Sequence, residues 1–122
     1  MLLVAQILAG LVCLLHLYFF LLETVLYRSR GVKVFGVKPE NVELMAVPMS
    51  NQGCYNAFLA LALLLGFVLP NPTTAAAFTV YGLVCVVIAG VWGAATVKMM
   101  ILYVQAVPAL LALLAFYLAQ RA

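Results

Sequence analysis

Long apolar runs alternate with short polar breaks along the whole chain. A bilayer core needs roughly 20 apolar residues for one helical crossing. Because lipid offers the backbone no hydrogen-bond partners, a segment that crosses it alone must be helical. The pattern therefore predicts an all-α protein, an integral membrane four-helix bundle that forms a single transmembrane domain. The four apolar runs that are long enough cover about residues 2–27, 48–69, 75–97 and 99–118.

The longest polar break, about residues 28–46, is predicted to be a loop. It carries most of the charges in the chain, namely Arg28, Arg30, Lys33, Lys38, Glu40 and Glu43. Within it, Pro39-Glu40 is typical of a helix start, with proline in the first turn and an acid near the positive helix end. We expect that helix to continue into the second crossing, with a bend at Pro48 near the membrane surface.

The remaining breaks are short. Residues 70–73, with the sequence Pro-Asn-Pro-Thr, predict a tight uncharged turn. Lys98 is the single charge between the third and fourth apolar runs, so another short turn is expected beside it. Pro108 lies inside the fourth run and leaves the carbonyl of Val104 without its helical partner, which predicts a kink.

Composition excludes several classes of protein. The chain is 69% hydrophobic and 7% charged, whereas an ordinary soluble domain is about 25% charged. The net charge of +3 is concentrated in one loop and does not form the basic face that a nucleic-acid-binding protein needs. Cys13, Cys54 and Cys85 stand singly in apolar runs without metal-type spacing, so we interpret them as packing residues.

The basic residues also predict the orientation in the membrane. Lys and Arg mark the cytoplasmic side. Four of them lie in the loop after the first helix and Lys98 follows the third, whereas Arg121 alone lies on the other side. Both termini are therefore expected to be extracytoplasmic, with the lipid bilayer as the principal partner.

Polar side chains inside the apolar runs are the candidates for function, because such groups are costly in lipid. His16 and Glu23 are seven residues apart and share one helix face. At about 1.5 Å per residue, Glu23 lies about 8 Å and His16 about 18 Å from Arg28 along the helix axis. On the predicted orientation, both residues and the candidate polar residues of the second and fourth runs fall in the cytoplasmic half. The predicted ligand-binding residues are His16, Glu23, Asn51, Gln52, Tyr55, Asn56 and Gln105.

We expect the predicted residues to line one polar pocket that opens toward the cytoplasm. Glu23 is placed at its mouth, near Arg28 or Arg30, and His16 at its floor. Asn or Gln at helix interfaces can also simply hydrogen-bond across a bundle, for about 0.6 kcal/mol each on average. A purely structural role for these side chains therefore stays open.

Small residues in the third apolar run predict close helix packing. Ala89 with Gly93, and Gly90 with Ala94, are pairs spaced four apart. Such pairs let two backbones approach closely, and packing is a main source of helix association in lipid. We expect a neighbouring helix to contact Ala89, Gly90 and Gly93.

Five segments carry a resemblance that covers nearly the whole chain in order. They are HLYFFLLE (16–23), KVFG (33–36), NQGCYNAFLA (51–60), GAATV (93–97) and QAVPA (105–109). The chain resembles the bacterial four-helix membrane family called domain of unknown function 1304. The resemblance implies a small protein of the bacterial inner membrane with no assigned activity, and it implies no catalytic residues.

Three functions remain open. The first is binding or transport of a small molecule or proton-coupled solute, with His16 and Glu23 as the titratable groups. The second is a structural or assembly subunit without a ligand, a homo-oligomer included. The third is a small membrane enzyme of glutathione-transferase type, although no nucleophile–base pair or metal cluster supports it. No cofactor is identified, because a single intramembrane histidine is weak support for haem.

Overall fold

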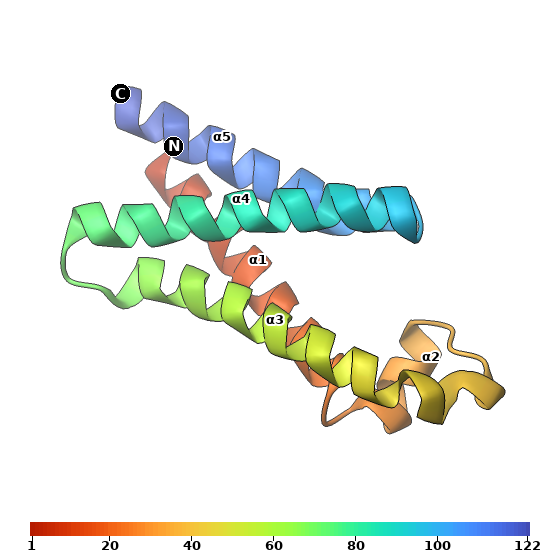
Figure 1. The fold of residues 1–122 in the computed structure, drawn as a ribbon. Helices are drawn as coiled ribbons and strands as arrows, with labels where there is room; N and C mark the ends of the chain where they lie inside the picture. Colours follow the sequence, from red (N-terminus) through yellow and green to blue (C-terminus); the bar gives the residue numbers. More distant parts are fainter. The chain divides into compact units, whose positions relative to one another are not determined.

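The computed structural model describes residues 1–122, and all of its regular elements are helical (Figure 1). Four segments are long and apolar enough to cross a membrane, which confirms the all-α, four-helix architecture and makes the chain a multi-pass membrane protein. These segments are Leu2–Glu23, Pro39–Val68, Pro72–Thr96 and Leu102–Arg121. In order, the elements are α1 (Leu2–Glu23), the π-helix η1 (Tyr27–Gly31), α2 (Val32–Val34), the 3-10 helix η2 (Pro39–Asn41), α3 (Val42–Val68), α4 (Pro72–Thr96), the π-helix η3 (Leu102–Ala106) and α5 (Val107–Arg121).

Residues 28–46, for which the polar pattern predicts a loop, are largely helical. They contain most of η1, all of α2 and η2, and the first residues of α3. The predicted helix start at Pro39-Glu40 is confirmed, because η2 begins at Pro39 and leads directly into α3. The helix therefore starts before residue 48, and Pro48 lies inside it. Proline removes one backbone donor from a helix, and α3 nevertheless continues through Pro48 to Val68.

The start of α4 follows from local capping. Asn71 is its N-cap, and the Asn71 side-chain oxygen accepts a hydrogen bond of 3.0 Å from the backbone N–H of Thr74. Pro72 occupies the first helical position, where its missing N–H costs nothing. The crossing therefore begins at Pro72, three residues before the apolar run that predicts it.

A π-helical turn accommodates Pro108. Val107 N–H donates to the carbonyl of Leu102, five residues earlier, and Pro108 then lies in the first turn of α5. A π-turn widens the helix by one residue and shifts the register of its hydrogen bonds. The missing N–H of Pro108 thus falls where the π-helix η3 changes to the α-helix α5. The sequence predicted a kink at Val104 but not this change of helix type.

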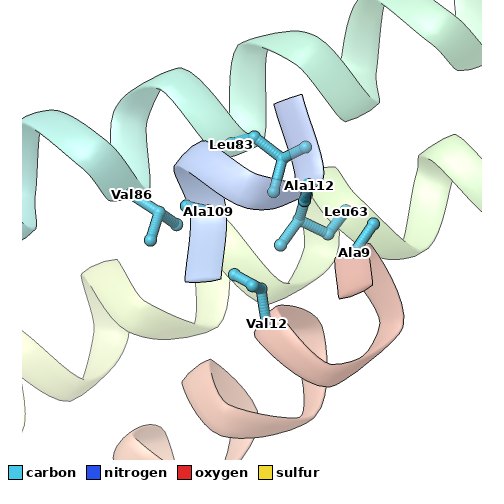
Figure 2. Close-up of a cluster of buried hydrophobic side chains, with 7 residues drawn as sticks. All are labelled: Ala9, Val12, Leu63, Leu83, Val86, Ala109 and Ala112. Atoms are coloured by element: carbon cyan, nitrogen blue, oxygen red, sulfur yellow. The ribbon is translucent and has the colours of Figure 1, made fainter. Parts of the chain in front are cut away.

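The chain forms two compact units, and the single transmembrane domain expected from the apolar pattern stays a prediction. The first contains Met1–Leu14 and Leu59–Ala122, and the second contains Leu15–Phe58. Most of the charges and three of the amides of the candidate site lie in the second unit. In the first unit, side chains from α1, α3, α4 and α5 point toward one another (Figure 2). They form an apolar core of Ala9, Val12, Leu63, Leu83, Val86, Ala109 and Ala112.

Close packing of α4 is confirmed at two of the three predicted positions. A Cβ added at Gly90 would lie 2.7 Å from the backbone nitrogen of Ala106, and one at Gly93 would lie 2.7 Å from Ile101 Cγ2. The prediction is wrong for Ala89, whose side chain is exposed. Consecutive positions on a helix differ by about 100°, so Ala89 lies beside the contact face and not on it.

Candidate functional site

The second unit brings the end of α1 against α3 at a glycine. A Cβ added at Gly53 would lie 2.8 Å from Thr24 Cγ2 and 3.1 Å from Glu23 Cβ. These separations are shorter than ordinary van der Waals contact, so a side chain at Gly53 would push α1 and α3 apart. Because Gly53 has no side chain, the backbones of α1 and α3 lie close together, and polar side chains on the two helices can meet.

Asn56 lies three residues after Gly53 and thus on the same side of α3. Its amide Nδ2 donates a hydrogen bond of 2.7 Å to Oε2 of Glu23. Both residues are buried, with Glu23 at 5% exposure and Asn56 at 9%. A carboxyl group at this depth needs such a partner, because an unsatisfied polar group away from water is costly.

His16 lies two turns before Glu23 on α1 and is also fully buried. Its ring meets that of Phe19 edge-on, with 5.6 Å between the ring centroids and 79° between the planes. His16 is buried, but it is not among the residues that line the polar pocket found in this unit, where the sequence placed it at the floor. Neutral imidazole can both donate and accept a proton, so His16 has the chemistry of a relay group.

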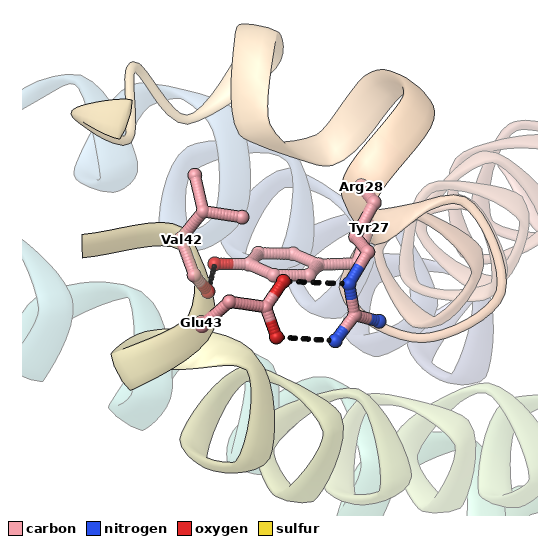
Figure 3. A network of polar contacts seen from close by, with 4 residues as sticks. All are labelled: Tyr27, Arg28, Val42 and Glu43. Carbon is pink, nitrogen blue, oxygen red and sulfur yellow. Dashed lines mark hydrogen bonds and ion pairs between the residues drawn. The ribbon is translucent and has the colours of Figure 1, made fainter. Parts of the chain in front are cut away.

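A pair of polar contacts joins the segment after α1 to the start of α3 (Figure 3). Arg28 Nε and Nη2 each donate a hydrogen bond of 2.9 Å to the two carboxylate oxygens of Glu43. Tyr27 Oη donates to the carbonyl of Val42 at 2.9 Å. The hydrogen bonds that Arg28 donates to Glu43, together with the negative charge of Glu43, raise the pKa of the Arg28 guanidinium above its ordinary value.

The Arg28 contacts correct the predicted environment of Glu23. Glu23 does not form the mouth of a pocket beside Arg28, because Arg28 is bonded to Glu43 and Glu23 is buried against Asn56. Glu43 is farther from Arg28 in sequence than Glu23 is. The helical turn η1 nevertheless directs the Arg28 side chain toward the start of α3.

A polar pocket of about 500 Å³ opens beside this ion pair. Its polar lining comes from Arg28, Ser50, Asn51 and Cys54, and Ala46 with Val47 forms its apolar wall. The α3 residues that line it recur four apart, which places them on one side of the helix. Asn51 is the one predicted site residue in this lining. Arg28, Ser50 and Cys54 were missed, although the four-residue spacing of Ala46, Ser50 and Cys54 was a signal for them.

The other predicted site residues have different surroundings. Gln52 and Tyr55 are exposed on α3, and Tyr55 meets Phe58 edge-on. Gln105 is half-buried within η3, which belongs to the first unit. The predicted residues thus include a hydrogen-bonded pair, Glu23 with Asn56, and a residue of the open pocket, Asn51.

The family model described as "Protein of unknown function (DUF1304)" matches residues 10–117. The chain belongs to this family. The resemblance seen in the sequence is therefore confirmed, and it covers every candidate site residue. No curated protein and no solved structure matches the chain.

This DUF1304 protein has a second cavity, which lies within its first unit. The cavity is about 290 Å³ in volume, and its lining is mostly alanine and large apolar side chains. Gln6 and the buried Thr79 are its polar members, and the Thr79 hydroxyl donates to the carbonyl of Ala75 at 3.1 Å. None of the predicted site residues lines it.

The DUF1304 chain offers no group of three or more His, Cys, Asp or Glu side chains that could hold a metal ion. What its second unit offers is a buried carboxyl group, which can exchange a proton, and an open pocket with hydrogen-bond donors.

Proposed function

We propose that this protein binds, and in a further step transports, a small polar or proton-coupled solute taken from the cytoplasm. The polar pocket of the second unit is its binding site. Glu23, hydrogen-bonded to Asn56, is the group that exchanges the proton, and His16 is its relay partner on the same helix.

The buried hydrogen bond between Asn56 and Glu23 is the observation that carries this proposal. A carboxyl group in a membrane helix adds little stability, since hydrogen bonds between such helices contribute about 0.6 kcal/mol on average. Intramembrane carboxyl groups that face the protein interior commonly mark proton or solute pathways.

The polar pocket supports the same function independently. Its volume of about 500 Å³ falls within the range of roughly 300–1,000 Å³ that is usual for small-molecule sites. It also joins an apolar wall to a few hydrogen-bonding groups, as such sites do. Ser50 and Asn51 are exposed within it and are available to a ligand.

Native mass spectrometry of the gently purified protein tests the proposed binding. We expect the wild-type protein to retain a small molecule that Ser50→Leu loses, because leucine at that position removes the hydroxyl and narrows the pocket. Ser29→Leu is the matched control, since Ser29 is also an exposed serine of the second unit but does not line the pocket. Protein that carries no small molecule in any form would favour the structural or assembly role.

We also propose that the membrane is the bacterial inner membrane and that both termini are extracytoplasmic. The asymmetric basic residues support this orientation. In a cysteine-free background, a cysteine introduced at Lys33 should react with an impermeant maleimide only after the cells are opened. One introduced at Thr73, in the first turn of α4, should react in intact cells. Labelling at position 33 from outside would overturn the orientation.

A further inference from the structure

We propose that the polar pocket of the second unit takes a ligand that bears a phosphate group, with Arg28, Ser50 and Asn51 as its donors. This inference rests on the proposed function, because the pocket is the same. The phosphate group is either the headgroup of a phospholipid or part of a soluble compound. Both sources present the same chemistry to the pocket.

The guanidinium of Arg28 is the positive group of the site. A guanidinium has five N–H donors, and Glu43 accepts from Nε and Nη2. In Figure 3 the third nitrogen, Nη1, points away from Glu43. Arg28 therefore keeps donors for an anion while Glu43 holds the orientation of its side chain.

The remaining lining adds neutral donors beside the guanidinium. The Ser50 hydroxyl and the Asn51 amide supply donors from α3, on a different element from Arg28. A phosphate group accepts hydrogen bonds from several directions and forms strong charge-assisted bonds with arginine. Ala46 and Val47 leave an apolar wall for the rest of the ligand, because the pocket of about 500 Å³ is larger than one phosphate group.

The charge of the surrounding segment favours an anion. Residues 28–46 carry four basic and two acidic side chains. One of the two acids, Glu43, is paired with Arg28. A basic segment next to a membrane helix attracts anionic headgroups of the cytoplasmic leaflet. A bound phosphate group would compete with the Glu43 carboxylate, because both interact with the Arg28 guanidinium.

This competition gives two variants of the same ion pair opposite effects. Arg28→Gln should weaken the apparent affinity for inorganic phosphate by roughly tenfold or more, since it removes the charged donor. Glu43→Gln should strengthen it by about threefold or more, since it removes the competing carboxylate. A loss of folding through the broken ion pair would affect both variants alike. Arg30→Gln, an exposed arginine outside the lining, should change the affinity by less than about twofold.

The measurement is the melting temperature of the detergent-purified full-length protein, titrated with sodium phosphate at constant ionic strength. A second titration adds phosphatidylglycerol to the micelles, with diacylglycerol as the phosphate-free control. Stabilisation by inorganic phosphate identifies a soluble ligand, and stabilisation by phosphatidylglycerol alone identifies a lipid headgroup.

The inference falls if neither phosphate source stabilises the protein, or if Arg28→Gln and Arg30→Gln respond equally. It also falls if Glu43→Gln weakens binding. In those cases a small molecule that is retained by wild-type protein but lost from Ser50→Leu would leave the proposed function in place. If wild-type protein also retains no small molecule, both the phosphate inference and the proposed binding function are wrong.

Discussion

Replacing Gly90 with leucine is expected to prevent most of the protein from folding. A Cβ at this position would lie 2.7 Å from the backbone nitrogen and 2.9 Å from Cβ of Ala106. Ala106 is 1% exposed, within the π-helix η3, and its backbone cannot rotate away as a flexible side chain could. Overpacking typically costs about 1–3 kcal/mol and occasionally more. We expect the upper part of that range, because the obstacle is backbone.

The measurement for Gly90→Leu is the folded yield by size-exclusion chromatography in detergent, followed by thermal unfolding of what remains. Ala89→Leu is the matched control, since Ala89 is the preceding residue of α4 and its side chain is exposed. It should fold with nearly normal yield. A melting temperature for Gly90→Leu within about 2 °C of wild type would contradict the close packing of α4 on η3.

The second large effect is expected at Glu23. In Glu23→Ala the buried amide of Asn56 loses the oxygen to which it donates, at 2.7 Å, and a small cavity opens. Leaving a buried donor without a partner costs about 1–3 kcal/mol. Glu23→Gln keeps the side-chain shape and an acceptor oxygen for Asn56, so its cost should stay below about 1 kcal/mol.

These Glu23 variants separate stability from function. Glutamine cannot exchange a proton, so Glu23→Gln should fold well yet lose any proton-coupled step. Unfolding in a mild detergent titrated with dodecyl sulfate gives the free energies. The single variants Glu23→Ala and Asn56→Ala, together with the double variant, give the interaction energy between the two side chains. We expect it to be about 0.6 to 1.7 kcal/mol. Equal stability for wild type, Glu23→Ala and Glu23→Gln would show that the hydrogen bond contributes nothing.

Sequence reasoning reached the candidate site only in part. It selected Glu23 and Asn56 because amides and carboxyl groups are out of place in an apolar run. It could not pair them, since the approach of α1 to α3 depends on the absence of a side chain at Gly53. The partner of Arg28 was missed for a related reason. An arginine in a polar segment can reach several carboxylates. The conformation of η1 directs the Arg28 side chain toward Glu43.

The α4 helix starts at Pro72, three residues before the predicted position. The amino-acid sequence alone was sufficient to predict the membrane environment, the number of crossings and the helix start at Pro39. These depend on local properties, namely the length of apolar runs and the φ angle of proline. The three-dimensional structure was needed to show which small residues are contacts, that Pro108 follows a π-turn, and that a pocket opens beside Arg28. Such features arise where residues distant in sequence meet, and their energies depend on distances of a few tenths of an ångström. No periodicity in a single chain encodes those distances.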